Sequence, residues 1–177
     1  MIVNKKIIAV MVTALALSAC NGGSSKHVAC NDEAAVSLVT QVLQESLDKT
    51  LAKNLKELIK QNSIKDLDPA KLKLSAKNVQ FSLVDSRTEM IDPNSPKTSC
   101  SIDLSTTLPS DLFRKADDAR FKLNKETEAE YADILGVDYE NNKINLVLKY
   151  IVQPTDKGDK ILVKLENETN TLKLISD

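Results

Sequence analysis

The stretch NDEAAVSLVTQVLQESLDKTLAKNLKELIK, residues 31–60, carries the strongest periodic pattern in the chain. Apolar side chains recur along it every three or four residues, as they do on one face of an α-helix. They are Ala35, Leu38, Val39, Val42, Leu43, Leu47, Leu51, Leu55, Leu58 and Ile59. Asn31 is suited to cap this helix, and the acids at 32 and 33 suit its N-terminal dipole. We therefore predict one long helix over about residues 32–61.

An apolar stripe on a helix has two interpretations. The helix can lie on a membrane or a partner protein, or it can pack on a sheet of its own chain. We favour packing on a sheet, because segments with strand patterns follow the helix and need a covering layer.

Several segments after the helix alternate apolar and polar residues, as half-buried strands do. Residues 98–107 follow a turn at Ile91–Pro96, so we expect them to return as the second strand of a hairpin. Further strands are predicted over residues 72–76, 79–83, 144–152, 161–165 and 172–175. The first two of these are out of phase, which indicates a β-bulge or a break near Lys77 and Asn78.

Helical patterns interrupt the strands between residues 110 and 135. One helix is expected to begin after Pro109, and a weaker pattern ends at Gly136. The predicted fold class is α+β, with the long N-terminal helix packed on an antiparallel sheet of about five or six strands. In element order this is similar to the cystatin-like or NTF2-like arrangement. That likeness covers no motif and implies no residue roles.

The first twenty residues have the features of an export signal. Lys5 and Lys6 precede an apolar run at residues 7–17, which is too short for a membrane-spanning helix. Small residues and a cysteine follow, and residues 17–20, Leu-Ser-Ala-Cys, resemble the lipobox of bacterial lipoproteins.

The resemblance implies that the chain is cut before Cys20 and that diacylglycerol is attached to the Cys20 thiol. Acylation of the new amine usually follows, and two or more acyl chains anchor a protein stably. In Gram-negative lipoproteins, an aspartate directly after the lipidated cysteine tends to retain the protein in the inner membrane. Here that residue is Asn21, so the resemblance implies the outer membrane, with the protein facing the periplasm. We expect residues 1–19 to be a signal peptide, residues 20–30 a flexible lipidated tether, and residues 31–177 a single periplasmic α+β domain.

Two cysteines remain once Cys20 carries lipid. Cys30 and Cys100 form an even pair in an oxidising compartment, and Cys100 lies on the apolar face of its predicted strand. We therefore predict a disulfide between them. The alternative is a free nucleophilic cysteine, but neither thiol belongs to a Cys-x-x-Cys motif or has a suitable histidine.

Charge and composition narrow the choice of partners. Removing residues 1–19 takes away two lysines and no acid, which changes the formal net charge from −1 to −3. This argues against nucleic acid, which binds basic surfaces, and against broad adhesion to anionic headgroups. The chain has no tryptophan, three tyrosines and three phenylalanines, which disfavours aromatic carbohydrate-binding platforms.

The sequence offers little catalytic chemistry. His27 is the only histidine and lies in the predicted tether, so a Ser-His-Asp triad or a histidine-rich zinc site is not indicated. Paired carboxylates occur at Asp66 and Asp68 and at residues 117 and 118. The alternating glutamates at 126, 128 and 130 are interpreted as a solvated face. We predict no catalytic, cofactor-binding or metal-binding residues.

Three classes of function remain open. The first is a binding or envelope-interaction module of the adaptor, inhibitor or immunity type, with an envelope protein as its partner and the lipid anchor in the membrane. The second is a carrier of a lipid or another apolar ligand, held where the sheet curves around the helix. The third is a hydrolase that uses two carboxylates. The first class is favoured, because it requires no catalytic residues.

Overall fold

The computed structural model describes residues 27–61 and 76–176. These residues form helix α1 (Glu33–Lys60), the hairpin strands β1 (Gln80–Ile91) and β2 (Thr98–Thr107), and helices α3 (Ser110–Lys122) and α4 (Glu128–Leu135). Strands β3 (Asp138–Glu140), β4 (Lys143–Pro154) and β5 (Ile161–Leu165) follow, and helix α5 (Thr169–Ser176) comes last. The fold is α+β, as the sequence predicts.

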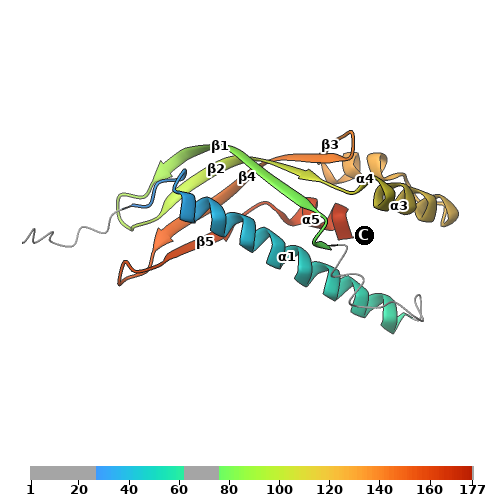
Figure 1. The fold of residues 1–177 in the computed structure, drawn as a ribbon, viewed down its shortest axis with the longest axis horizontal. Coiled ribbons are helices and arrows are strands. Elements are labelled where there is room, and N and C mark those ends of the chain that lie inside the picture. The colour runs from blue at the N-terminus through green and yellow to red at the C-terminus, as the bar shows by residue number, and fades with distance from the viewer. Residues whose placement is uncertain (1–26, 62–75, 177) are drawn as a thin grey trace, which may run out of the picture.

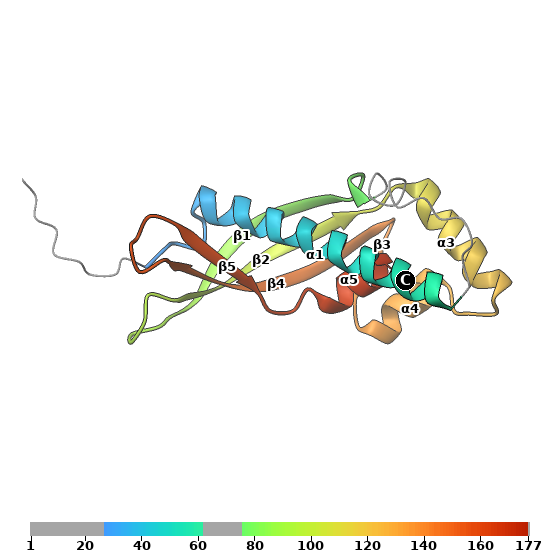
Figure 2. The same cartoon turned by 90° about the horizontal axis from the view of Figure 1, so that it is seen from below.

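The five strands form one antiparallel sheet in the order β1-β2-β4-β3, with β5 also paired to β4. Strand β4 is long enough to pair with two short neighbours along one edge. Its first part pairs with β3, and its last part pairs with β5. Helix α1 crosses one face of this sheet (Figures 1 and 2), and no described element covers the opposite face.

Helix α1 matches the predicted long helix to within one residue at each end. The predicted cap, Asn31, is wrong by one position: the Asp32 side chain accepts a hydrogen bond from the Ala35 amide at 3.0 Å and so caps the first turn. The buried positions are Ala35, Val39, Leu43, Leu47 and Leu55, at the spacing of one helical face. Leu58 and Ile59 belong to the same predicted stripe but are exposed, so the buried face of α1 ends before the last turn of the helix.

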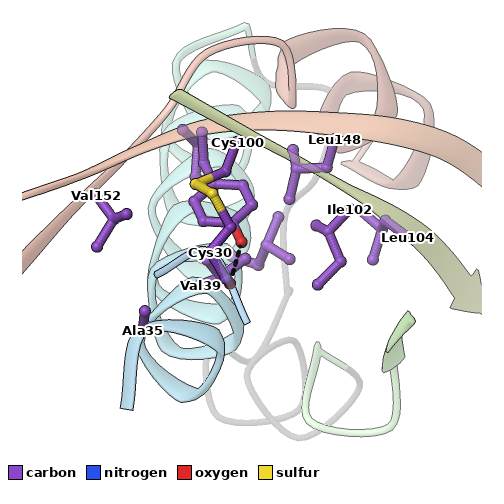
Figure 3. Close-up of a cluster of buried hydrophobic side chains, with 11 residues drawn as sticks. Cys30, Ala35, Val39, Cys100, Ile102, Leu104, Leu148 and Val152 are labelled. Carbon is purple, nitrogen blue, oxygen red and sulfur yellow. Dashed lines mark hydrogen bonds between the residues drawn. A yellow bond between two sulfur atoms is a disulfide. The ribbon is translucent and has the colours of Figure 1, made fainter. Parts of the chain in front are cut away.

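The main core lies between α1 and the sheet (Figure 3). Its largest fully buried side chain is Tyr150 of β4, whose hydroxyl donates to the Cys30 carbonyl oxygen at 2.7 Å. Burial raises the pKa of Tyr150. Val39, Ile102 and Leu148 pack in the same cluster, and burying each such side chain stabilises the fold by about 1.5–3 kcal/mol.

The phase slip predicted near Lys77 and Asn78 is a break, because these two residues form a turn before β1 begins. Bulges do occur, but later in β1, between Val84 and Arg87 and between Thr88 and Met90. The strand predicted at residues 72–76 falls almost wholly outside the described residues, and Ala76 itself is helical.

The strand predicted at residues 172–175 is wrong, because this segment is part of helix α5. Leu172 and Leu174 alternate as in a strand, but Thr171 is also buried, which is the spacing of a helical face. The Leu172 amide donates to the Glu168 carbonyl at 3.0 Å. Asn54 of α1 then fixes the end of α5 by donating to the Ser176 carbonyl at 3.2 Å.

Candidate functional site

The described molecule is elongated, and its two ends are built differently (Figures 1 and 2). One end carries the start of α1 and the two turns that join β1 to β2 and β4 to β5. We call it the tether end, because the predicted tether leads to it. The other end carries helices α3 and α4, which we call the distal hairpin.

The helices of the distal hairpin have clear local start and stop signals. Pro109 precedes α3, where it does not interrupt the helical hydrogen bonds. Thr127 and Glu130 form a capping box at the start of α4. Hydrogen bonds from the Thr127 backbone and hydroxyl hold the pKa of Glu130 below its ordinary value. Gly136 ends α4 in the left-handed conformation, at φ 65°, as expected for a helix stop.

Arg120 joins the two helices of the hairpin. Its Nε donates to the Glu126 carbonyl oxygen at 2.6 Å, and its Nη1 lies 3.7 Å from Oε1 of Glu128. Its guanidinium lies 4.3 Å from the centre of the Tyr131 ring, which is cation–π geometry. Asp117 adds a further link, because its carboxylate accepts from the Glu128 amide at 2.8 Å.

The prediction of a solvated glutamate face at residues 126, 128 and 130 is therefore wrong for one of the three. Glu128 is buried beside Arg120. Glu126 and Glu130 are exposed as predicted, although Glu126 lies 3.9 Å from Nη2 of Arg120 and Glu130 belongs to the capping box. Sequence spacing missed this, because the pairing requires α4 to fold back against α3.

Aromatic and amide contacts attach the hairpin to the rest of the fold. The ring of Phe113 in α3 stacks on Tyr139 of β3, with the ring centres 5.0 Å apart. Burial raises the pKa of Tyr139. Asn170 of α5 donates to the Leu135 carbonyl at 2.9 Å. The hairpin is thus held at its base, while the turn at residues 123–127 faces outward.

The end of α3, just before that turn, carries the most exposed large apolar side chain of the described residues. Phe121 of α3 is 82% exposed, and Leu123 at the start of the turn is 66% exposed. Lys122 lies between them in the sequence, and Lys125 follows. We call residues 121–125 the distal tip. The spacing of nearby acids in the sequence is a signal for this exposure. Phe121 follows Asp117 and Asp118 by four and three residues, which places it on the polar side of α3.

The tether end carries an open groove of about 1320 Å³ between α1 and the β4–β5 turn. Apolar side chains contribute to its walls, among them Val28, Leu38 and Ile161. Polar and charged residues line it as well: His27, Asp32, Asp156, Lys157, Asp159 and Lys160. The groove adjoins the main core, because Val28 and Ile161 also pack against the core cluster between α1 and the sheet.

The open face of the sheet is more polar and carries its own pairing. Arg87 of β1 forms a bidentate ion pair with Asp103 of β2, and it also donates to Ser101. This contact with Arg87 holds the pKa of Asp103 below its ordinary value. Exposed apolar residues, such as Val84 and Val147, are separated by these charges.

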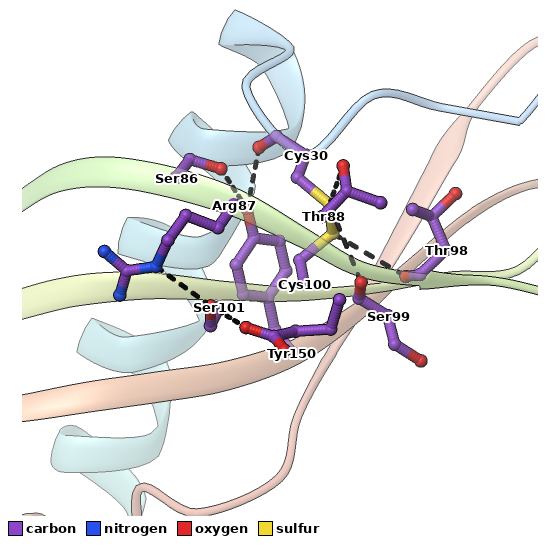
Figure 4. The surroundings of a disulfide bond; sticks show 10 residues. Cys30, Ser86, Arg87, Thr88, Thr98, Ser99, Cys100, Ser101 and Tyr150 are labelled. Atoms are coloured by element: carbon purple, nitrogen blue, oxygen red, sulfur yellow. Dashed lines mark hydrogen bonds between the residues drawn. A yellow bond between two sulfur atoms is a disulfide. The ribbon is translucent and has the colours of Figure 1, made fainter.

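The structure joins Cys30 and Cys100 by a disulfide, the pairing that the sequence predicts (Figure 4). Their Cα atoms are 5.7 Å apart, and both residues are buried. The Thr88 hydroxyl lies 3.4 Å from the Cys30 sulfur. The bond therefore links the start of α1 to a central strand of the sheet.

The remaining predicted residues are scattered. Cys20, Asp66 and Asp68 lie outside the described residues, and His27 is exposed at the groove. Asp117 caps α4, and the neighbouring Asp118 is exposed. Within residues 27–61 and 76–176, no three histidine, cysteine or acidic side chains cluster as metal ligands would. No helix in these ranges has the length and apolar character needed to cross a bilayer.

Comparison with known proteins adds no further constraint, because no family model, no curated protein and no solved structure matches this chain.

Proposed function

We propose that this protein is a lipid-anchored envelope protein that binds a protein partner through its distal tip. In this proposal the signal peptide is removed, Cys20 carries the lipid in the outer membrane, and residues 21–29 tether the fold to the bilayer on the periplasmic side. The observation that carries the proposal is the exposure of Phe121 and Leu123 on a hairpin whose shape is fixed from within.

Exposed aromatic and leucine side chains at a rigid position are suited to binding. Aromatic side chains dominate the energetics of protein interfaces when they enter a pocket of the partner. The Arg120 contacts and the α4 capping box hold the turn in one conformation, so less conformational entropy is lost when a partner binds. Lys122 and Lys125 beside the apolar pair favour a partner with an acidic rim.

The tip also lies opposite the tether end. A lipid anchor at Cys20 holds the tether end close to the membrane, so the tip is the part of the fold that can reach farthest into the periplasm. This arrangement supports an adaptor, inhibitor or immunity role, in which the anchor gives location and the tip gives specificity.

Capture of partners from crosslinked envelopes tests the tip. The wild-type protein is expected to retain a stoichiometric protein partner that the variant Phe121→Ser/Leu123→Ser loses. The matched control is Val84→Ser/Val147→Ser, which removes two exposed apolar side chains from the open sheet face and should keep the partner. Unfolding of the tip variant should change by less than about 0.5 kcal/mol, because both side chains are exposed. A partner that stays bound to the tip variant would contradict the proposal.

The anchor is tested separately. Replacing Cys20 by Ser should abolish metabolic labelling with fatty acid and should release the protein from the membrane fraction. Continued lipid labelling of the Cys20→Ser protein would refute the lipobox interpretation.

A further inference from the structure

We propose that the groove at the tether end binds a phospholipid of the leaflet that holds the anchor. One acyl chain would lie along the apolar wall, and the phosphate would lie at the lysines of the β4–β5 turn. This inference rests on the lipid anchor proposed above. It adds a second contact with the membrane, made by the folded part of the protein.

The groove combines the two kinds of surface that a phospholipid requires. Val28, Leu38 and Ile161 supply apolar contact, and Pro96 and Pro154 extend it without adding charge. Lys157 and Lys160 supply cations, and neither has an ion-pair partner within the described parts of the chain. An apolar channel beside unpaired lysines suits an acyl chain with a phosphate at its end.

The lining carries charges of both signs. Lys157 and Lys160 share it with three carboxylates, those of Asp32, Asp156 and Asp159, so two positive and three negative charges give it a formal charge of −1 with His27 neutral. Asp32 also accepts from the Ala35 amide, and Asp159 from the Thr155 hydroxyl at 2.7 Å, but these neutral donors leave both charges in place. Such a lining suits a zwitterionic headgroup, whose phosphate meets the lysines and whose amine meets a carboxylate.

The length of the tether brings the groove to the bilayer. His27 lines the groove and follows the predicted lipid attachment site, Cys20, by seven residues. Seven residues span at most about 25 Å when fully extended. The anchor thus keeps the groove within reach of the headgroups at a high effective concentration, so even weak affinity for lipid is sufficient for binding.

Occupation of the groove would fix the orientation of the whole molecule. A single flexible tether leaves the fold free to rotate, whereas a tether and a seated lipid together hold the tether end against the leaflet. The long axis then points away from the membrane and presents the distal tip to its partner.

The chain contains no tryptophan, which allows a direct test. We would introduce a single reporter, Leu38→Trp, in the groove and reconstitute the lipidated mature protein in vesicles of phosphatidylethanolamine and phosphatidylglycerol. Phe121→Trp at the distal tip is the matched control. When the phospholipids carry brominated acyl chains, the groove reporter is expected to lose emission and the tip reporter to keep it.

The outcomes separate the two proposals. Protein that does not float with the vesicles would refute the anchor, and with it this inference. Floating protein with an unquenched, water-exposed groove reporter would overturn the inference alone. An unquenched reporter with blue-shifted emission would also overturn it, since another group, such as the acyl chains of the anchor itself, would then fill the groove.

A second variant tests the contact between the phosphate and the two lysines. Lys157→Glu/Lys160→Glu in the Leu38→Trp background should weaken quenching, while thermal unfolding stays close to that of the parent because both lysines are exposed. Quenching that is equally strong in this variant would refute the role of the two lysines.

Discussion

Different kinds of contact hold the helix–sheet body, which consists of α1 and the five strands, and the distal hairpin in their shapes. In the body, α1 and the strands bury large apolar side chains such as Leu43, Ile102 and Tyr150, and a disulfide crosses the same core. In the hairpin, the buried pair of Arg120 and Glu128 joins α3 to α4. Helix α4 also packs Ala132 against Ile144 and Leu174 of the rest of the fold.

The difference explains how the distal tip can expose Phe121 and Leu123. A hairpin held by apolar contacts between its helices would use such side chains as its core. Because polar contacts join α3 to α4, Phe121 and Leu123 are not buried between the two helices and remain available for a partner. The body supplies global stability, and the hairpin is expected to open locally at a lower free energy.

Removing the disulfide should have the largest effect and should weaken the body. Cys30→Ala/Cys100→Ala opens a loop with a sequence separation of 70 residues. In the chain-entropy model this lowers the free energy of unfolding by about 4 kcal/mol. Denaturant titration measures the loss. Hydrogen exchange in α4 should change little until the whole body unfolds. A selective loss of protection in α4 would contradict the view that the disulfide stabilises the body and not the hairpin.

Breaking the buried ion pair should have the next largest effect and should act on the hairpin. Arg120→Leu takes the guanidinium away from the buried Glu128 carboxylate, which costs about 3 kcal/mol. Hydrogen exchange should then accelerate in α3 and α4, and the strands should stay protected. The double variant Arg120→Leu/Glu128→Leu should recover most of the loss, because no charge remains buried. Failure to recover would show that the Arg120 contacts to Glu126 and Tyr131 dominate.

Loss of the α4 cap should have the smallest effect. Thr127→Ala removes the side-chain cap and should cost about 1 kcal/mol, seen as faster exchange at the start of α4. The pKa of Glu130 is lowered in the folded state. Its contribution is therefore present at neutral pH and is lost as the pH falls below the ordinary glutamate range towards the folded pKa. Acidification should weaken α4 less in Thr127→Ala than in the wild type. Equal acid sensitivity would argue against the capping box.

Sequence patterns predicted the body well, because each of its elements has one buried face. The apolar spacing of residues 35–55 and the alternation around Cys100, Ile102 and Leu104 follow directly from burial against a single layer. The same reasoning failed for the last segment, residues 172–175. Leu172 and Leu174 fit both a strand and a short helix, and only contacts with α1 and α4 decide between them.

The distal hairpin could be predicted only in outline. Its two helices have local signals, including Pro109, Thr127 and Gly136. The pairing of Arg120 with Glu128 depends on how the chain folds back at residues 123–127, and no spacing rule encodes that. The groove likewise combines residues from three distant segments, near residues 27–38, 96 and 154–161.

The disulfide has a mechanical consequence. A pull on the N-terminus enters the fold at Cys30 and passes through the sulfur atoms to Cys100 in β2. The backbone of helix α1 and strand β1 lies inside the closed loop, so the pull does not pass along it. Strand β2 leads directly through Leu108 and Pro109 into α3, so the shortest covalent route from the N-terminus to the distal tip bypasses α1 entirely. Along that route β2 is held on both sides by hydrogen bonds to β1 and β4, which resist sliding together rather than opening one by one.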